Sequence, residues 1–111
     1  MQAALDCAVP YVFERQQFGQ YLGRFQMMQA KLADMYVALQ SSRAYLYNSA
    51  ASCDLGIADN KNCAAVLLMC SENAVKVSLE AIQCLGIKFT IFAKNRDVLR
   101  IRKMSKLNCR I

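Results

Sequence analysis

Residues 14–26 of the chain read Glu-Arg-Gln-Gln-Phe-Gly-Gln-Tyr-Leu-Gly-Arg-Phe-Gln. The glycines of this segment, Gly19 and Gly23, are typical of a turn. Because apolar residues recur at helical spacing on both sides, the segment predicts the end of one helix, a tight turn and the start of the next. We expect Phe18 and Phe25 to face a core, while the arginine and glutamine side chains face outward as hydrogen-bond donors.

A helix is predicted on each side of this turn. Upstream, residues 2–16 carry one apolar stripe, although Pro10 removes a backbone donor and predicts a kink or an interruption. Downstream, residues 24–53 repeat apolar residues in a three-then-four rhythm, which is typical of a seam between packed helices. Gly56 is then placed to end this helix. The seam positions are Phe25, Met28, Leu32, Met35, Leu39, Ser42, Leu46, Ser49 and Cys53.

A third helix is predicted from an N-cap at Asp59 or Asn60 to about Cys84. It carries two adjacent apolar stripes, so more than half of its circumference must be covered on two sides. Three helices give too little cover, and we therefore expect a fourth helix or a homo-oligomer. The two stripes are Cys63, Leu67, Cys70, Ala74, Val77, Ala81 and Cys84, and Leu68, Val75, Leu79 and Ile82.

The composition favours a single all-α domain, arranged as an up-and-down helical bundle. With 111 residues, of which 56% are hydrophobic and 20% charged, the chain can bury a core. Five of the six cysteines fall on apolar stripes, and the chain has no histidine and no Cys-x-x-Cys pair. We therefore expect free, buried thiols in a reducing compartment and no metal site. No apolar run approaches the roughly 20 residues of a membrane span, so none is expected.

Charge divides the chain near Gly86. Residues 1–87 hold six Lys/Arg against seven Asp/Glu, whereas residues 88–111 hold eight Lys/Arg against Asp97 alone. A basic tail of this kind can bind nucleic acid or an anionic membrane surface. Because only two aromatic residues interleave with its charges, we favour a solvated tail and expect no nucleic-acid partner.

The chain resembles a known enzyme family around the turn and on both sides of it. The motifs are Val9-Pro10-Tyr11, Arg15-x-x-Phe18-Gly19, Phe25-Gln26, Met28-Gln29-x-Lys31, Asn62-Cys63-Ala64 and Gln83-Cys84-Leu85-Gly86. They are similar to the C-terminal helical domain of the acyl-CoA dehydrogenases, most closely to the isovaleryl-CoA dehydrogenase branch. The resemblance covers residues 1–86 and implies an incomplete C-terminal helical bundle, followed by a divergent basic tail over residues 87–111.

This resemblance implies FAD contacts. In the family, an arginine at the turn contacts the FAD pyrophosphate of a neighbouring subunit, and Arg15 stands at that position, where its guanidinium fork suits a diphosphate. Gln26 matches a glutamine that also touches FAD. The segment Gln83-Cys84-Leu85-Gly86 matches the start of a Gln-x-x-Gly-Gly segment that completes the cofactor site. Ile87 replaces the second of those glycines, which puts this part of the site in doubt.

An activity is implied as well. The family oxidises acyl-CoA, here a short branched one such as isovaleryl-CoA of leucine catabolism, in the mitochondrial matrix, although the chain shows no transit peptide. Its members are tetramers, built as dimers of dimers, that pass electrons to an electron-transfer flavoprotein. The branch's glutamate base precedes the stretch that matches Met1, so we assign no catalytic residue and expect this chain alone to be inactive. The alternative is a non-catalytic helical association module that binds full-length subunits.

Overall fold

A computed structural model describes residues 1–57 and 59–86 of the chain. The predicted basic tail, residues 87–111, lies outside the described residues. The elements in chain order are α1 (Gln2–Glu14), β1 (Gln16–Gln17), β2 (Gln20–Tyr21), the 3-10 helix η1 (Leu22–Arg24), α2 (Gln26–Asp54) and α3 (Asn60–Leu85). The predicted all-α bundle is confirmed, and none of the helices in this part of the chain is long and apolar enough to cross a membrane.

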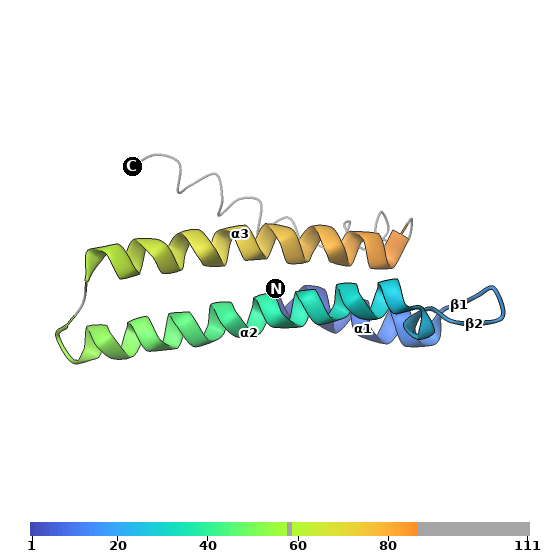
Figure 1. The fold of residues 1–111 in the computed structure, drawn as a ribbon, viewed down its shortest axis with the longest axis horizontal. Helices are drawn as coiled ribbons and strands as arrows, with labels where there is room; N and C mark the ends of the chain where they lie inside the picture. Colours follow the sequence, from blue (N-terminus) through green and yellow to red (C-terminus); the bar gives the residue numbers. More distant parts are fainter. Residues whose placement is uncertain (58, 87–111) are drawn as a thin grey trace.

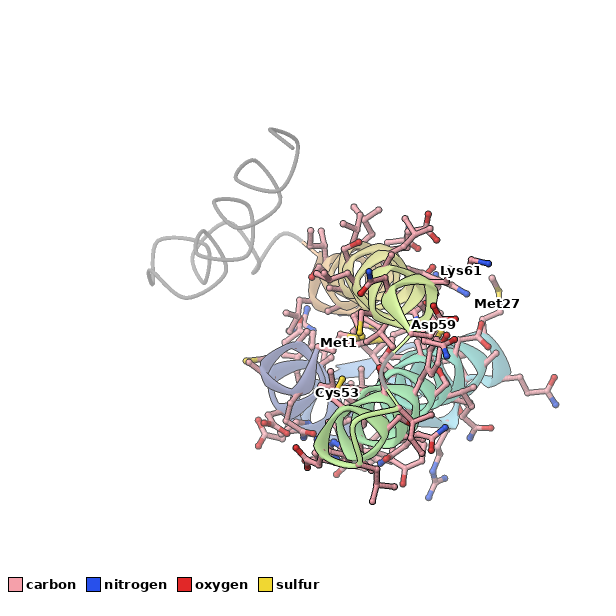
Figure 2. All side chains as sticks on the ribbon, turned by 90° about the vertical axis from the view of Figure 1, so that its left-hand side faces the viewer. Met1, Met27, Cys53, Asp59 and Lys61 are labelled. Carbon is pink, nitrogen blue, oxygen red and sulfur yellow. The ribbon has the colours of Figure 1, made fainter. Side chains whose placement is uncertain are left out.

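The helices α2 and α3 form a long antiparallel hairpin, and α1 lies beside only one end of it (Figure 1). In a view along the bundle, the three helices occupy the corners of a triangle (Figure 2). We call residues 1–42 and 73–86 the three-helix end. Residues 43–57 and 59–72 form the two-helix end. At the border between the two ends, Arg43 still contacts α1, because it donates to Oε1 of Gln2 at 3.1 Å.

Nearly all of the core lies at the three-helix end. The clustered buried residues are Leu5, Ala8, Val12, Met35, Ala38, Leu39, Val77, Ala81 and Cys84. At the two-helix end, Val66 is the one buried residue among those described. The predicted seam of α2 is buried only as far as Ser42, because Leu46 is 49% exposed and Cys53 is exposed. Cys53 nevertheless still faces Cys63 of α3. The sequence carries the seam onward, but among residues 1–57 and 59–86 no third helix covers it there.

One apolar face of α3 is left exposed by the other described elements. Leu68, Val75 and Leu79 of the second predicted stripe are all more than half exposed. Leu67 of the first stripe is 59% exposed as well. The three helices thus leave uncovered the face that was expected to need further cover, and the homo-oligomer stays a prediction.

The ends of the long helices follow the sequence closely. Gly56 adopts φ +71° directly after α2, and its N–H donates to the carbonyl of Cys53 at 3.0 Å. The carboxylate of Asp59 accepts a hydrogen bond from the backbone N–H of Lys61 at 3.1 Å, as an N-cap does. By contrast, α1 runs through Pro10 without the predicted interruption. Pro10 lies on the exposed side of α1, so water can solvate the carbonyl that loses its donor.

The turn between α1 and α2 contains a small hairpin that was not predicted. Strands β1 and β2 pair antiparallel, with Gln17 opposite Gln20. The two linking residues, Phe18 and Gly19, have φ values of +54° and +77°, as a two-residue turn of the mirror-image type requires. The expectation that Phe18 faces a core is wrong, because it is 93% exposed at the tip. Its ring meets only the edge of Phe25, with ring centroids 6.5 Å apart.

Candidate functional site

A groove of about 430 Å³ lies at the three-helix end, where the turn meets the last residues of α3. Its lining includes an arginine and two glutamines but no carboxylate. The lining residues are Tyr11, Arg15, Gln17, Leu22, Met28, Gln83, Cys84, Leu85 and Gly86. The structure thus brings Arg15 together with the Gln83–Gly86 segment, which is 68 residues away in the sequence.

Arg15 has a fixed backbone and a free side chain. It follows α1 in an extended conformation, and its N–H donates to the carbonyl of Tyr11 at 2.9 Å. Its carbonyl accepts from the N–H of Leu22 at 2.9 Å. The side chain is exposed, and the single ion pair among residues 1–57 and 59–86 joins Lys31 to Glu80. The guanidinium is therefore not occupied by a carboxylate of the described chain.

The four residues at the end of α3 divide into two pairs. Cys84 and Leu85 are 3% and 8% exposed, so they anchor the helix in the core. Burial raises the pKa of the Cys84 thiol, with Glu80 adding to this effect and Lys31 opposing it, so the thiol stays neutral. Gln83 and Gly86 are exposed and form the part of this segment that a ligand can reach.

Gly86 provides an open position at the end of the groove. It caps α3 with φ +58°, and its N–H donates to the carbonyl of Ile82. A Cβ built on Gly86 would meet no described atom within 4 Å. The positive φ, rather than a close neighbour among the described residues, therefore explains the glycine.

Lys31 fixes the position of Gln83. Its Nζ donates to Oε2 of Glu80 at 2.5 Å and to Oε1 of Gln83 at 2.5 Å, which ties α2 to α3 beside the groove. Because Glu80 and Gln83 are three residues apart, they lie on the same face of α3. Lys31 was not predicted as a site residue. Two features of the sequence could have indicated it: the place of Lys31 in the family motif, and the three-residue spacing of its partners Glu80 and Gln83.

Gln26, the remaining predicted site residue, lies outside the groove. It is the first residue of α2 and is exposed. Conversely, Gln17 and Leu22 had no direct signal in the sequence, whereas Met28 was predicted as a seam position and as part of a family motif but not as a residue of the groove. Tyr11 could have been found, since it belongs to the family motif Val9-Pro10-Tyr11 and lies in the last turn of α1, just before Arg15.

The sequence matches the family described as acyl-CoA dehydrogenase, C-terminal domain, over residues 1–98. The chain belongs to this family. The match extends past Gly86 into the segment expected to diverge, and the domain boundary at residue 86 stays a prediction.

Similar proteins agree with this assignment. The chain is 58% identical over 86 residues to mitochondrial isovaleryl-CoA dehydrogenase of Oryza sativa subsp. japonica. The matched region covers 78% of the chain and 21% of that protein. It is 55% identical over 86 residues, with the same coverage, to mitochondrial 2-methylacyl-CoA dehydrogenase of Solanum tuberosum. Among solved structures, PigA with FAD and proline matches with a TM-score of 0.73 and 34% identity over 78% of the chain and 22% of that structure. The chain thus spans about a fifth of each of these proteins.

Proposed function

We propose that the chain forms one wall of an FAD site in an acyl-CoA dehydrogenase, and that its groove holds the diphosphate of the cofactor. The observation that carries this proposal is the meeting of Arg15 with Gln83 and Gly86 in a groove without a carboxylate. A guanidinium presents paired donors to a diphosphate, and the missing carboxylates remove the charge that would repel one. The similarity to a structure solved with FAD supports the choice of cofactor.

Each residue has a distinct part in holding the group. Arg15 binds the diphosphate oxygens. Gln83, whose Oε1 is engaged by Lys31, offers the two N–H groups of its amide. Gly86 allows its backbone to come close to the ligand. Gln26 stands in the first turn of α2, where the positive end of the helix dipole favours an anion and Phe25 supplies no side-chain cap.

The proposed reaction is the oxidation of a short branched acyl-CoA such as isovaleryl-CoA, as in leucine breakdown in the mitochondrial matrix. The relatives named as isovaleryl- and 2-methylacyl-CoA dehydrogenases, both mitochondrial, support this substrate class. When bound, FAD supplies the acceptor for the hydride that leaves the substrate. We further propose that the enzyme works as a dimer of dimers and that an electron-transfer flavoprotein takes up its electrons.

The described carboxylates do not supply the base of this reaction. None lines the groove. Three of the seven described carboxylates are also engaged within the chain: Glu80 is bound by Lys31, Asp6 accepts from Gln2 at 2.8 Å, and Asp59 caps α3. We therefore expect the isolated chain to show no acyl-CoA-dependent reduction of an artificial dye, and such activity would contradict this assignment.

The FAD proposal is tested by titrating the chain and two variants with FAD and following flavin fluorescence. Arg15→Ala should weaken binding by about tenfold or more, since hydrogen bonds to charged groups contribute about 1.5–3 kcal/mol. Arg24→Ala is the matched control, because Arg24 is exposed near the turn but does not line the groove. An equal loss in both variants, or no loss in Arg15→Ala, would overturn the proposal.

A second function, a non-catalytic association module for full-length subunits, is favoured by one observation. Leu68, Val75 and Leu79 form an exposed apolar stripe on α3, and such stripes mark association surfaces. Co-purification with a full-length relative, lost when Leu68 and Leu79 are changed to serine, would support it. A chain that stays monomeric and unbound at all concentrations would count against it.

A further inference from the structure

Two cysteines face each other at the two-helix end, far from the groove. The Sγ atoms of Cys53, near the end of α2, and Cys63, in the first turns of α3, are 4.0 Å apart. Cys53 is exposed and Cys63 is half-buried. Both line a small cavity of about 80 Å³ together with Asp59. Figure 2, which looks onto this end, shows Cys53 and Asp59 here.

Each cysteine lies near a helix end with a recognisable cap. Gly56 adopts a positive φ after α2, and the carboxylate of Asp59 caps the start of α3. No third metal-ligating side chain joins the pair, because the described residues contain no group of three that could hold a metal ion. Two thiols without a further ligand are suited to disulfide chemistry rather than to metal binding.

We propose that Cys53 and Cys63 form a redox-responsive dithiol, which a low-molecular-weight disulfide such as oxidised glutathione converts into an intramolecular disulfide. One protein thiolate attacks a glutathione sulfur and releases one glutathione thiolate. The second protein thiolate then attacks the protein sulfur of the mixed disulfide and releases the other. The two electrons pass to glutathione, which also takes up the two protons lost by the thiols.

The geometry leaves only a short movement for this step. A disulfide bond measures about 2.05 Å, so side-chain rotation must draw the sulfurs together by roughly 2 Å. The hydrogen bond with Cys63 raises the pKa of the Cys53 thiol, and the charges of Cys63 and Asp54 act in the same direction. Thiolate is therefore scarce near neutral pH, so exchange with the oxidant is slow there and becomes faster as the pH rises.

The bond would join α2 to α3 where little else does. Val66 is the one buried side chain described at this end, so a covalent link there restricts the unfolded chain without disturbing a packed core. We expect the oxidised chain to melt roughly 10 °C higher than the reduced chain.

The test uses the full chain with Cys70→Ser as background, because Cys63 and Cys70 otherwise share one tryptic peptide. The reduced protein is equilibrated with mixtures of reduced and oxidised glutathione, alkylated and digested with trypsin. Cleavage after Lys61 separates Cys53 from Cys63, so their peptides stay joined only through a disulfide. Intact mass, peptide mapping and circular dichroism are read in parallel.

We expect one cross-linked pair of peptides, formed at about tenfold less oxidised glutathione than is needed to glutathionylate the single-cysteine variants Cys53→Ser and Cys63→Ser. Cys7→Ser is the matched control and should oxidise like the background. Mixed disulfides with glutathione at both positions, or cross-links that involve other cysteines equally, would overturn the proposal. So would loss of the cross-link in Cys7→Ser with its fold intact.

Discussion

The two ends of the α2–α3 hairpin carry similar apolar patterns but have very different burial. Leu39, at the three-helix end, is 7% exposed, whereas Leu46, seven residues later on the same seam, is 49% exposed. On α3, Val77 is 1% exposed and Leu67 is 59% exposed, although both lie on one predicted stripe. The difference is α1, which contributes Leu5, Ala8 and Val12 to one end only.

This comparison shows that a helical pattern identifies a face but not what covers it. Two helices bury one line of contact, and a third is needed to enclose it from the side. The three-helix end therefore supplies the stable framework for Arg15 and the groove. The two-helix end presents apolar residues and two thiols to other molecules.

The largest contrast is expected from truncating one apolar side chain at each end. Met35→Ala should lower the free energy of unfolding by about 2–5 kcal/mol, because Met35 is 1% exposed and leaves a cavity. Leu67→Ala should change it by less than about 1 kcal/mol. Urea unfolding followed by circular dichroism measures both, and equal losses would show that both ends are packed alike.

Ser42 marks the border between the two ends and should have the next largest effect. Its Oγ donates to the carbonyl of Ala38 at 2.7 Å and accepts from Nδ2 of Asn73 at 2.9 Å. Ser42→Ala leaves the Asn73 amide without this partner and should cost about 1–2 kcal/mol of unfolding free energy. Ser41→Ala is the matched control, since Ser41 bonds the same carbonyl but is exposed. Similar costs in the two variants would refute a role for Asn73.

At the two-helix end, the connection itself should tolerate less change than the apolar face. Gly56→Ala places a Cβ at φ +71° and should cost about 1 kcal/mol through backbone strain alone, because no described atom lies within 4 Å of that Cβ. Gly56→Asn should lose less, since asparagine tolerates this conformation. Thermal unfolding of both variants checks the order, and the reverse order would contradict it.

The smallest expected effect is a pH dependence at the three-helix end. Burial raises the pKa of Cys84 above its usual value of 9.0, so the folded state holds this proton more tightly than the unfolded state. The resulting stability is fully present below pH 9 and is lost as the pH rises through the pKa of the folded state. Unfolding under reducing conditions should show a smaller loss above pH 9 in Cys84→Ala than in the parent chain. Parallel curves for the two proteins would contradict this.

The helices were predictable because their signals are local. The periodicity of α2, the N-cap at Asp59 and the positive φ of Gly56 depend on neighbouring residues. The exposure of Leu46 and Cys53 could not be predicted from the sequence, because it depends on how far α1 extends along the α2–α3 hairpin. The hairpin at Phe18-Gly19 was missed because a non-glycine residue at positive φ gives a weaker turn signal than two glycines.

The site was only partly predictable. Arg15 and Gln83–Gly86 were found through the family motifs, and the structure places them in one groove. The role of Lys31 could be recognised only from the packing of α2 on α3, because its two acceptors lie 49 and 52 residues away in the sequence. Gln26 follows from the motif alone and stays a prediction.

The most direct test of the proposed diphosphate site is a titration of the ¹⁵N-labelled chain with ADP, followed by amide chemical shifts. ADP carries the diphosphate without the flavin, and adenosine is the control that lacks it. Shifts should concentrate at Arg15, Gln17 and Gly86, with the two-helix end unmoved and adenosine without effect. Shifts centred on the two-helix end, or equal responses to ADP and adenosine, would contradict a diphosphate site in this groove.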